Sequence, residues 1–106
     1  MNDKHKEIID KLPAFLGQYP LCEHRLFVYG SVARNTDRFD SDIDVMCVLN
    51  DDHFIEQNHD LIREIKADAR FEFDEKLDLQ FCTNSALENE ESIFMRDFRK
   101  DKISLD

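Results

Sequence analysis

The pair Gly30-Ser31, followed after ten residues by Asp42 and Asp44, is the feature that most constrains how this chain can fold. One apolar, strand-like run ends at Gly30, and a second begins directly after Asp44. Gly30 is also one of only 2 glycines in the chain. A glycine directly after a β-branched and aromatic run marks a tight turn or a close backbone approach to a ligand. Two strands are therefore predicted to bracket a polar loop suited to a charged group.

The composition limits the classes of function. The length of 106 residues suits a single domain, 1–106, with one modest core and no separate substrate domain. A formal charge of −10 repels nucleic acids and anionic membranes, so no direct nucleic-acid binding is expected. No signal-peptide pattern or membrane-spanning apolar run occurs, and the 3 cysteines form no CxxC pair. The expected compartment is a reducing cytoplasm.

The periodicity of apolar residues predicts alternating strands and helices. Strands are expected over 25–29, 42–49 and 76–82, with a short edge strand over 103–105. Helices are expected over 3–17, 31–35 and 52–69, and from 85 onward. This order predicts an α/β fold, a small mixed β-sheet flanked by helices.

Local signals refine the helix boundaries. Pro13 removes a backbone donor, so a kink or break is expected near Leu12. Ser31 is expected to cap the short second helix. Ser85 and Glu88 have the spacing of a capping box and are expected to open the last helix.

Several side chains are expected to have structural roles. Phe94, Met95 and Phe98 are more often core than interface at such spacing, and Cys47 and Cys82 lie in apolar runs that favour burial. The histidines are expected to be solvated rather than zinc ligands. They are His5, His24, His53 and His59.

Three aspartates carry the predicted chemistry. Asp42 and Asp44 are i, i+2 on one strand and so face the same side, and Asp78 lies on the polar face of the strand 76–82. Converging carboxylates repel, which raises their pKa values unless a divalent cation neutralises them. Mg²⁺ suits such a site because it is held by few carboxylates and by substrate phosphates. Two Mg²⁺ ions would stabilise the attacking and leaving oxygens of a phosphoryl displacement, with a nucleoside triphosphate as co-substrate.

Gly30 and Ser31 gain a role beside these carboxylates. A helix that begins at Ser31 would direct backbone N–H groups toward a phosphate. Arg34 lies one turn later and either reaches the same phosphates or forms a surface ion pair. Taken singly, Asp42 could be a turn residue and Asp78 a solvent-facing one, but their joint spacing with Gly30 favours a site.

These residues resemble the DNA polymerase β-type nucleotidyltransferase superfamily, and within it the minimal nucleotidyltransferases, over about residues 25–82. The resemblance implies the nucleotidyltransferase fold and transfer of AMP from ATP to a hydroxyl with release of pyrophosphate. It implies that Gly30 and Ser31 contact the triphosphate and that Asp42 and Asp44 bind magnesium. Asp78 would complete the site as a metal ligand or a base.

The same resemblance implies a partner. Many similar minimal nucleotidyltransferases are antitoxins that add AMP to a tyrosine of a HEPN-type ribonuclease toxin. Many members also have a basic residue after Gly-Ser and a glycine after the arginine, where Val32 and Asn35 stand here. An acidic surface suits a basic partner. The alternatives are a small-molecule, aminoglycoside-like nucleotidyltransferase and a catalytically silent antitoxin that acts by binding alone.

Overall fold

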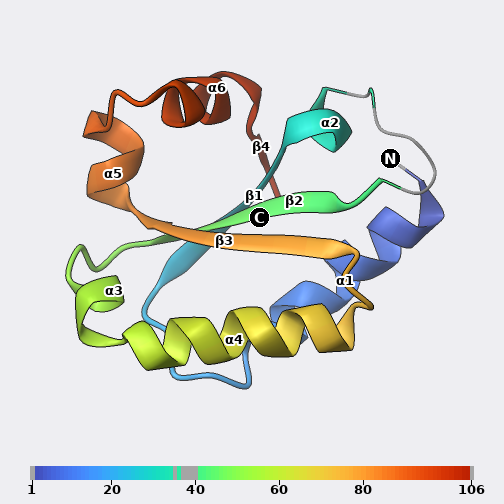
Figure 1. Ribbon diagram of the computed structural model, residues 1–106, viewed down its shortest axis with the longest axis horizontal. Helices are drawn as coiled ribbons and strands as arrows, with labels where there is room; N and C mark the ends of the chain where they lie inside the picture. Colours follow the sequence, from blue (N-terminus) through green and yellow to red (C-terminus); the bar gives the residue numbers. More distant parts are fainter. Residues whose placement is uncertain (1, 35, 37–40, 106) are drawn as a thin grey trace.

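A mixed β-sheet forms the centre of the molecule in the computed structural model, which describes residues 2–34, 36 and 41–105. Within these residues the sheet has four strands in the order β3-β2-β1-β4 (Figure 1). β1 pairs antiparallel with β2 and β4, whereas β2 and β3 run parallel. The predicted small mixed sheet flanked by helices is confirmed. The strands are β1 (His24–Tyr29), β2 (Ile43–Leu49), β3 (Leu77–Thr83) and β4 (Ile103–Ser104).

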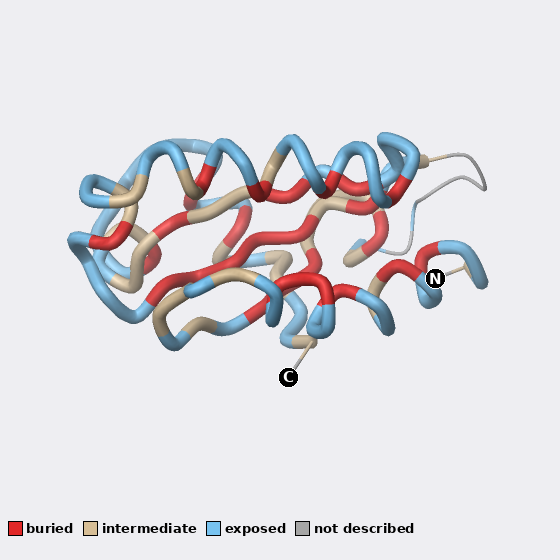
Figure 2. The backbone as a smooth tube through the Cα atoms, turned by 90° about the horizontal axis from the view of Figure 1, so that it is seen from below, coloured by how far each residue is buried: buried red, intermediate tan, exposed pale blue. Residues whose placement is uncertain are grey.

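Different helices cover the two faces of the sheet. The helices α1 (Asp3–Leu16) and α4 (His59–Glu72) pack on one face, and α5 (Asn84–Asn89) and α6 (Ile93–Asp101) pack on part of the other (Figure 1). β2 is buried along almost all of its length because both of its faces are covered. Figure 2 shows the buried residues concentrated in the sheet and on the helix sides that face it.

The strand β3 shows how the sequence assigns residues to faces. Leu77, Leu79 and Phe81 join the core beneath α1 and α4, whereas Cys82 joins the core beneath α5 and α6. Because side chains alternate along a strand, Asp78 lies on the same face as Cys82. The predicted alternation of this strand is confirmed, and it leaves Asp78 on the face that α5 and α6 only partly cover.

Of the kink or break expected near Leu12, the break does not occur, because α1 runs unbroken from Asp3 to Leu16 with Pro13 inside it. An internal proline costs a helix about 3 kcal/mol. Leu12 and Leu16 are buried in the core on either side of Pro13. Packing of these side chains offsets the local cost of the proline.

The predicted helix over 52–69 is instead two helices, α3 (Phe54–Gln57) and α4. Asn58 lies between them in a non-helical conformation, and its side-chain amide donates to the Phe54 carbonyl at 3.0 Å. An asparagine side chain that bonds to nearby backbone competes with the helix ladder. The helix therefore restarts after Asn58.

The prediction that Ser85 and Glu88 open the last helix is also wrong. This segment forms two helices, and α5 is capped by Thr83, whose hydroxyl accepts from the Ala86 N–H at 3.2 Å. The helix α6 is capped by Ser92. Ser85 is the second residue of α5, so the capping-box spacing begins inside a helix that Thr83 has already opened.

Most of the side chains that were expected to have structural roles are buried. Met95, Phe98, Cys47 and Cys82 are buried as predicted, but Phe94 is half exposed. Among the histidines, His53 and His59 are exposed and His24 is half-buried.

The expectation that His5 is solvated is wrong. It is buried, and its Nε2 bonds to the Ser41 carbonyl at 2.7 Å. The contact anchors α1 to the residues that lead into β2, a long-range partner that local sequence does not disclose.

No helix within the described residues is both long enough and apolar enough to cross a membrane.

Replacing His5 with leucine keeps a buried side chain but leaves the Ser41 carbonyl without this donor. We expect the free energy of unfolding to fall by about 1–3 kcal/mol, because leucine cannot replace the hydrogen bond of the buried imidazole. His53→Leu, at an exposed position, should change it by less than about 0.5 kcal/mol. Urea denaturation of both variants checks this, and equal stabilities would contradict the anchoring role of His5.

Candidate active site

The centre of the candidate site is one row of residues across three strands. Tyr29 on β1 is paired with Asp44 on β2, and Asp44 is paired with Asp78 on β3. Residues directly opposite one another in a sheet point to the same face. The register therefore places a phenol and two carboxylates side by side on the face that carries α5 and α6.

The two paired carboxylates resist carrying charge together. Burial, the charge of Asp78 and a hydrogen bond with Asp78 raise the pKa of Asp44 to about 6, with a further contribution from Asp42. Burial and the charges of Asp44 and Asp78 also raise the pKa of Tyr29 above its ordinary value. Positive charge placed beside this pair would therefore be stabilised.

Asp42 stands apart from the pair. It is exposed and immediately precedes β2. In the described part of the chain, no three His, Cys, Asp or Glu side chains are gathered closely enough to hold a metal ion. All three predicted ligands line one cavity, but within it only Asp44 and Asp78 are joined by a hydrogen bond. Two contacting carboxylates still fit Mg²⁺, which is commonly held by one or two carboxylates and completes its coordination with water and substrate phosphates.

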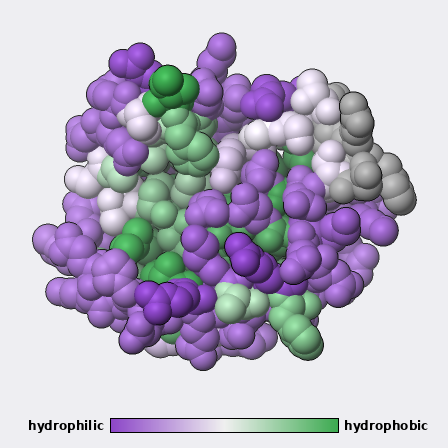
Figure 3. Space-filling model, in the orientation of Figure 1, coloured by the Kyte–Doolittle hydropathy of each residue, from purple (hydrophilic) through white to green (hydrophobic). Residues whose placement is uncertain are grey.

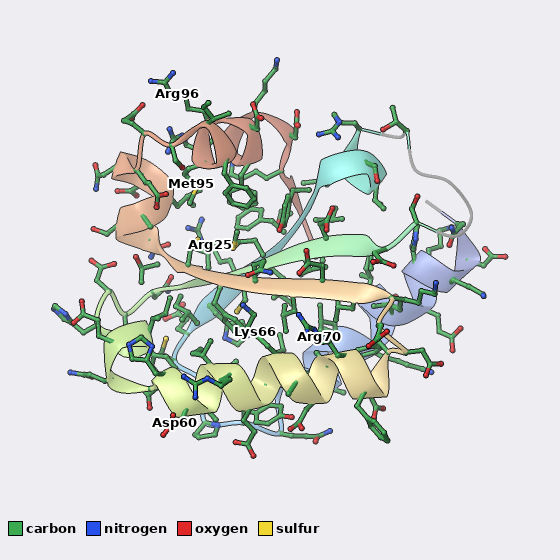
Figure 4. The ribbon with its side chains drawn as sticks, viewed as in Figure 1. Arg25, Asp60, Lys66, Arg70, Met95 and Arg96 are labelled. Atoms are coloured by element: carbon green, nitrogen blue, oxygen red, sulfur yellow. The ribbon has the colours of Figure 1, made fainter. Side chains whose placement is uncertain are left out.

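A cavity of about 430 Å³ opens over the carboxylates. Its volume lies within the range of small-ligand sites, about 300–1,000 Å³. Arg70 on α4 contributes a positive charge to the wall, and Figure 4 shows Arg70 extending from α4 toward β3. The cavity can therefore hold an anionic ligand that is bound jointly by cations and by Arg70. Its lining residues are Asp42, Asp44, Arg70, Glu75, Leu77, Asp78 and Gln80.

A chain of hydrogen bonds from α4 holds Asp78 in place. The Lys66 ammonium donates to the Gln80 side-chain oxygen at 3.0 Å, and the Gln80 amide nitrogen donates to Asp78 Oδ1 at 2.8 Å. Because β3 is the edge strand, Lys66 reaches Gln80 around the side of the sheet (Figure 4). An ammonium bonds only to the oxygen of an amide. Lys66 therefore fixes the orientation of the Gln80 amide so that its NH₂ group faces Asp78.

Lys66, Arg70 and Gln80 were not among the residues that the sequence predicted for the site. The one available signal was the i, i+2 spacing of Gln80 from Asp78, which puts both on one face of the strand.

A glycine is needed at position 30 because the Asp44 carboxylate lies directly beside it. Gly30 has φ +72°, a conformation that side-chain-bearing residues rarely adopt, and a Cβ at this position would overlap Asp44 Oδ2. The glycine thus lets the backbone approach the Asp44 carboxylate closely. The tight turn predicted at Gly30 is confirmed by its positive φ, and a close approach to a ligand stays a prediction.

The expectation that Ser31 caps the second helix is wrong. The helix α2 spans Gly30–Ala33, and its N-cap is Tyr29. The positive φ of Gly30 turns the chain into the helix one residue earlier than the serine suggests. Ser31 lies in the first turn and is half-buried. A phosphate contact by Ser31 stays a prediction.

Arg34 forms an ion pair with α6. Its Nη1 lies 2.9 Å from Asp101 Oδ2, as the surface-pair alternative predicts, although its charge also acts to lower the pKa of Asp44. Val32, where many family members have a basic residue, is buried in the core. Asn35 lies outside the described residues. Phosphate binding by Arg34 stays a prediction.

Replacing Gly30 with alanine should destabilise the protein by about 2–4 kcal/mol, because the left-handed conformation and the overlap with Asp44 both oppose a side chain. In an Asp44→Ala background the overlap is removed. Gly30→Ala should then destabilise the protein by only about 1–2 kcal/mol, the cost of the left-handed backbone conformation. Gly17→Ala, at φ −64°, should change stability by at most about 1 kcal/mol. Chemical denaturation of the four proteins of the Gly30/Asp44 cycle, and of Gly17→Ala as the control, checks these values. A full penalty in the Asp44→Ala background would show that Asp44 is not the obstacle.

Asp44→Asn should stabilise the metal-free protein at pH 7 by about 1 kcal/mol, less than a fully buried carboxyl would give because the pair is partly solvated. Folding raises the pKa of Asp44 from 3.8 to about 6. Wild-type stability is therefore highest below the lower value and falls as the pH rises through the higher one. The stability of Asp44→Asn should not fall in this way, because asparagine does not ionise. Urea denaturation with EDTA across this pH range measures the difference. Parallel stability curves would mean that the carboxylates do not repel.

Comparison with known proteins identifies the fold. The family model described as polymerase beta, nucleotidyltransferase matches residues 19–98, a span that includes every predicted site residue. A search of the curated proteins found no match. A chain in a crystal structure of a toxin–antitoxin with AMP-PNP is 16% identical with a TM-score of 0.64, over 92% of this chain and 71% of that chain.

Two further solved structures agree. A chain in the complex of a tri-AMPylated Shewanella oneidensis HEPN toxin with MNT antitoxin is 15% identical with a TM-score of 0.59, over 94% of this chain and 70% of that one. A Sulfolobus solfataricus protein provisionally described as a nucleotidyltransferase is 17% identical with a TM-score of 0.56, over 98% of this chain and 87% of its own. The predicted nucleotidyltransferase fold is thereby confirmed.

Proposed function

The chain belongs to the polymerase beta nucleotidyltransferase family, and from this membership we propose that it transfers AMP from ATP to a hydroxyl of a protein partner. The observation that carries the proposal is the paired Asp44 and Asp78, set beside Gly30 at the floor of a cavity. The partner we propose is a HEPN-type toxin, with tyrosine as the acceptor and this chain as the antitoxin. Two structurally similar complexes are of toxins with antitoxins, and one of those toxins is tri-AMPylated.

The reaction needs a bond between the acceptor oxygen and the α-phosphorus of ATP. The bond from that phosphorus to the oxygen bridging the β-phosphate breaks, and pyrophosphate leaves with the electron pair. Asp44 and Asp78 would hold Mg²⁺, with Asp42 at the wall of the same cavity as the third candidate ligand. Magnesium, when bound, neutralises the charge that develops on the phosphate oxygens.

The protein groups divide the remaining tasks. Asp78 is exposed to the cavity and oriented by Gln80, so it is placed either to bind metal or to accept the proton of the acceptor hydroxyl. Gly30 keeps the backbone close to Asp44, which leaves room for phosphate beside the carboxylate. Arg70 supplies positive charge across the cavity.

Surface properties support a protein acceptor. The net charge of −10 suits a basic, nucleic-acid-cleaving partner. Large apolar side chains are also exposed, with Phe71 87% and Ile103 50% accessible. Such residues supply the apolar contacts that a stable complex requires.

One observation favours the alternative of an antitoxin that acts by binding alone. Arg34 is held by Asp101 and Val32 is buried, so two positions near Gly30 do not present a free cation to a triphosphate. On that alternative the carboxylates would be unnecessary for neutralising the toxin.

Combined replacement of Asp42 and Asp44 by asparagine tests the proposal. We expect AMP transfer to fall by at least about 100-fold, since the carboxylates hold the ions and the reacting groups. Asp60→Asn, which removes one carboxylate charge from a fully exposed side chain on α4, should leave transfer unchanged. Intact-mass spectrometry of the proposed toxin partner after incubation with ATP and Mg²⁺ measures transfer. Full toxin neutralisation by the double variant would instead support binding alone, and an unmodified wild-type reaction would contradict a protein acceptor.

A further inference from the structure

We infer that Phe94 is the surface on which the purine base of the donor nucleotide stacks, with Tyr29 holding its ring in place. This inference rests on the proposed function and adds a base-binding wall that α6 supplies. Three features of Phe94 support it: the exposure of the side chain, the contacts of the ring with other aromatic rings, and the cavities that the residue lines.

Phe94 is half exposed, unlike the buried apolar residues of the same helix. Its side chain is 50% accessible, whereas Met95 and Phe98 on the same helix are 3% and 1% accessible. Its ring meets the Tyr29 ring edge to face, with centroids 5.8 Å apart and planes at 85°. Tyr29 in turn meets Phe98 at 5.3 Å and 84°. Phe94 is therefore braced by a fixed aromatic series while a large part of its surface stays open.

Two cavities meet at this aromatic pair. One, of about 330 Å³, is lined by Asp78 and Gln80 together with Tyr29 and Phe94. The other, of about 190 Å³, is lined by Gly30 together with the same two aromatic residues. Since Asp78 and Gln80 also line the carboxylate cavity, a ligand whose phosphate lies at the carboxylates can reach Phe94 without leaving the site.

The larger of these two cavities suits a flat ring with apolar faces. Met46, Cys82 and Met95 contribute its apolar wall, and Glu90 adds an acceptor. Figure 3 shows apolar side chains in a band from α6 across β3, with hydrophilic side chains on both sides. Stacking on an aromatic side chain tolerates any base because every base has a π-face. The base is the occupant we assign because Phe94 contacts Tyr29, which is paired with Asp44, so the ring position directly adjoins the phosphate position.

The test compares Phe94→Ala with Ile93→Ala. Ile93 is the preceding residue of α6, is 79% accessible and is not among the lining residues of either cavity. Each protein is titrated calorimetrically with an ATP analogue that cannot be cleaved between the α- and β-phosphates, in the presence of Mg²⁺. Inorganic tripolyphosphate with Mg²⁺ is the matched probe without a base.

We expect Phe94→Ala to weaken binding of the analogue by about 10- to 100-fold and to leave tripolyphosphate binding unchanged. Phe94→Tyr should restore analogue binding, because it keeps an aromatic face, and Ile93→Ala should match the wild type. Thermal unfolding of each variant verifies that the fold is retained.

Other results would overturn the inference. Equal weakening of both probes would mean that Phe94 shapes the phosphate site rather than stacking on a base. Unchanged analogue binding combined with a raised KM for the partner protein would assign the cavity to the acceptor side chain. If wild-type protein binds neither probe, the proposed function fails, and the inference fails with it. Analogue binding that is normal in the wild type and unaffected by Phe94→Ala overturns the inference alone.

Discussion

Repulsion between the Asp44 and Asp78 carboxylates is the constraint on which the rest of the candidate site depends. Parallel pairing of β2 and β3 forces the two groups together, and partial burial raises the pKa of Asp44. Two nearby like charges are unfavourable to folding unless a cation or a proton neutralises them. Two local features accommodate the pair. Gly30 leaves space beside the Asp44 carboxylate, and the Gln80 amide donates a hydrogen bond to Asp78. Such locally unfavourable arrangements are found mainly at functional sites.

One face of the sheet carries the larger core, and the other carries the candidate site. The face under α1 and α4 carries the larger core, which includes most of the apolar residues of β2. The opposite face has a smaller core under α5 and α6 and leaves the row of Tyr29, Asp44 and Asp78 partly open. Residues from the stable side also reach the site, because Lys66 and Arg70 extend from α4 around the edge strand β3 (Figure 4).

Sequence patterns predicted those parts of the fold that depend on residues close together in the sequence. The strands, the alternation of β3 and the tight turn at Gly30 all follow from residues a few positions apart. Helix boundaries were less predictable, because the Asn58 side chain interrupts a periodic run and core packing carries α1 through Pro13. Long-range contacts were not predictable. Lys66 and Gln80 are 14 positions apart and His5 and Ser41 are 36 positions apart, and no local pattern encodes such contacts.

The central claim is that Asp44 and Asp78 form the cation site beneath the phosphates of a bound nucleotide. A crystal structure of the protein with Mn²⁺ in place of Mg²⁺ and a non-cleavable ATP analogue tests it most directly, because anomalous scattering locates manganese without reference to the protein atoms. We predict manganese bound by oxygens of both Asp44 and Asp78 and in contact with the phosphates, in the cavity that both carboxylates line. Manganese bound elsewhere, or a nucleotide whose phosphates lie away from these two carboxylates, would contradict the account.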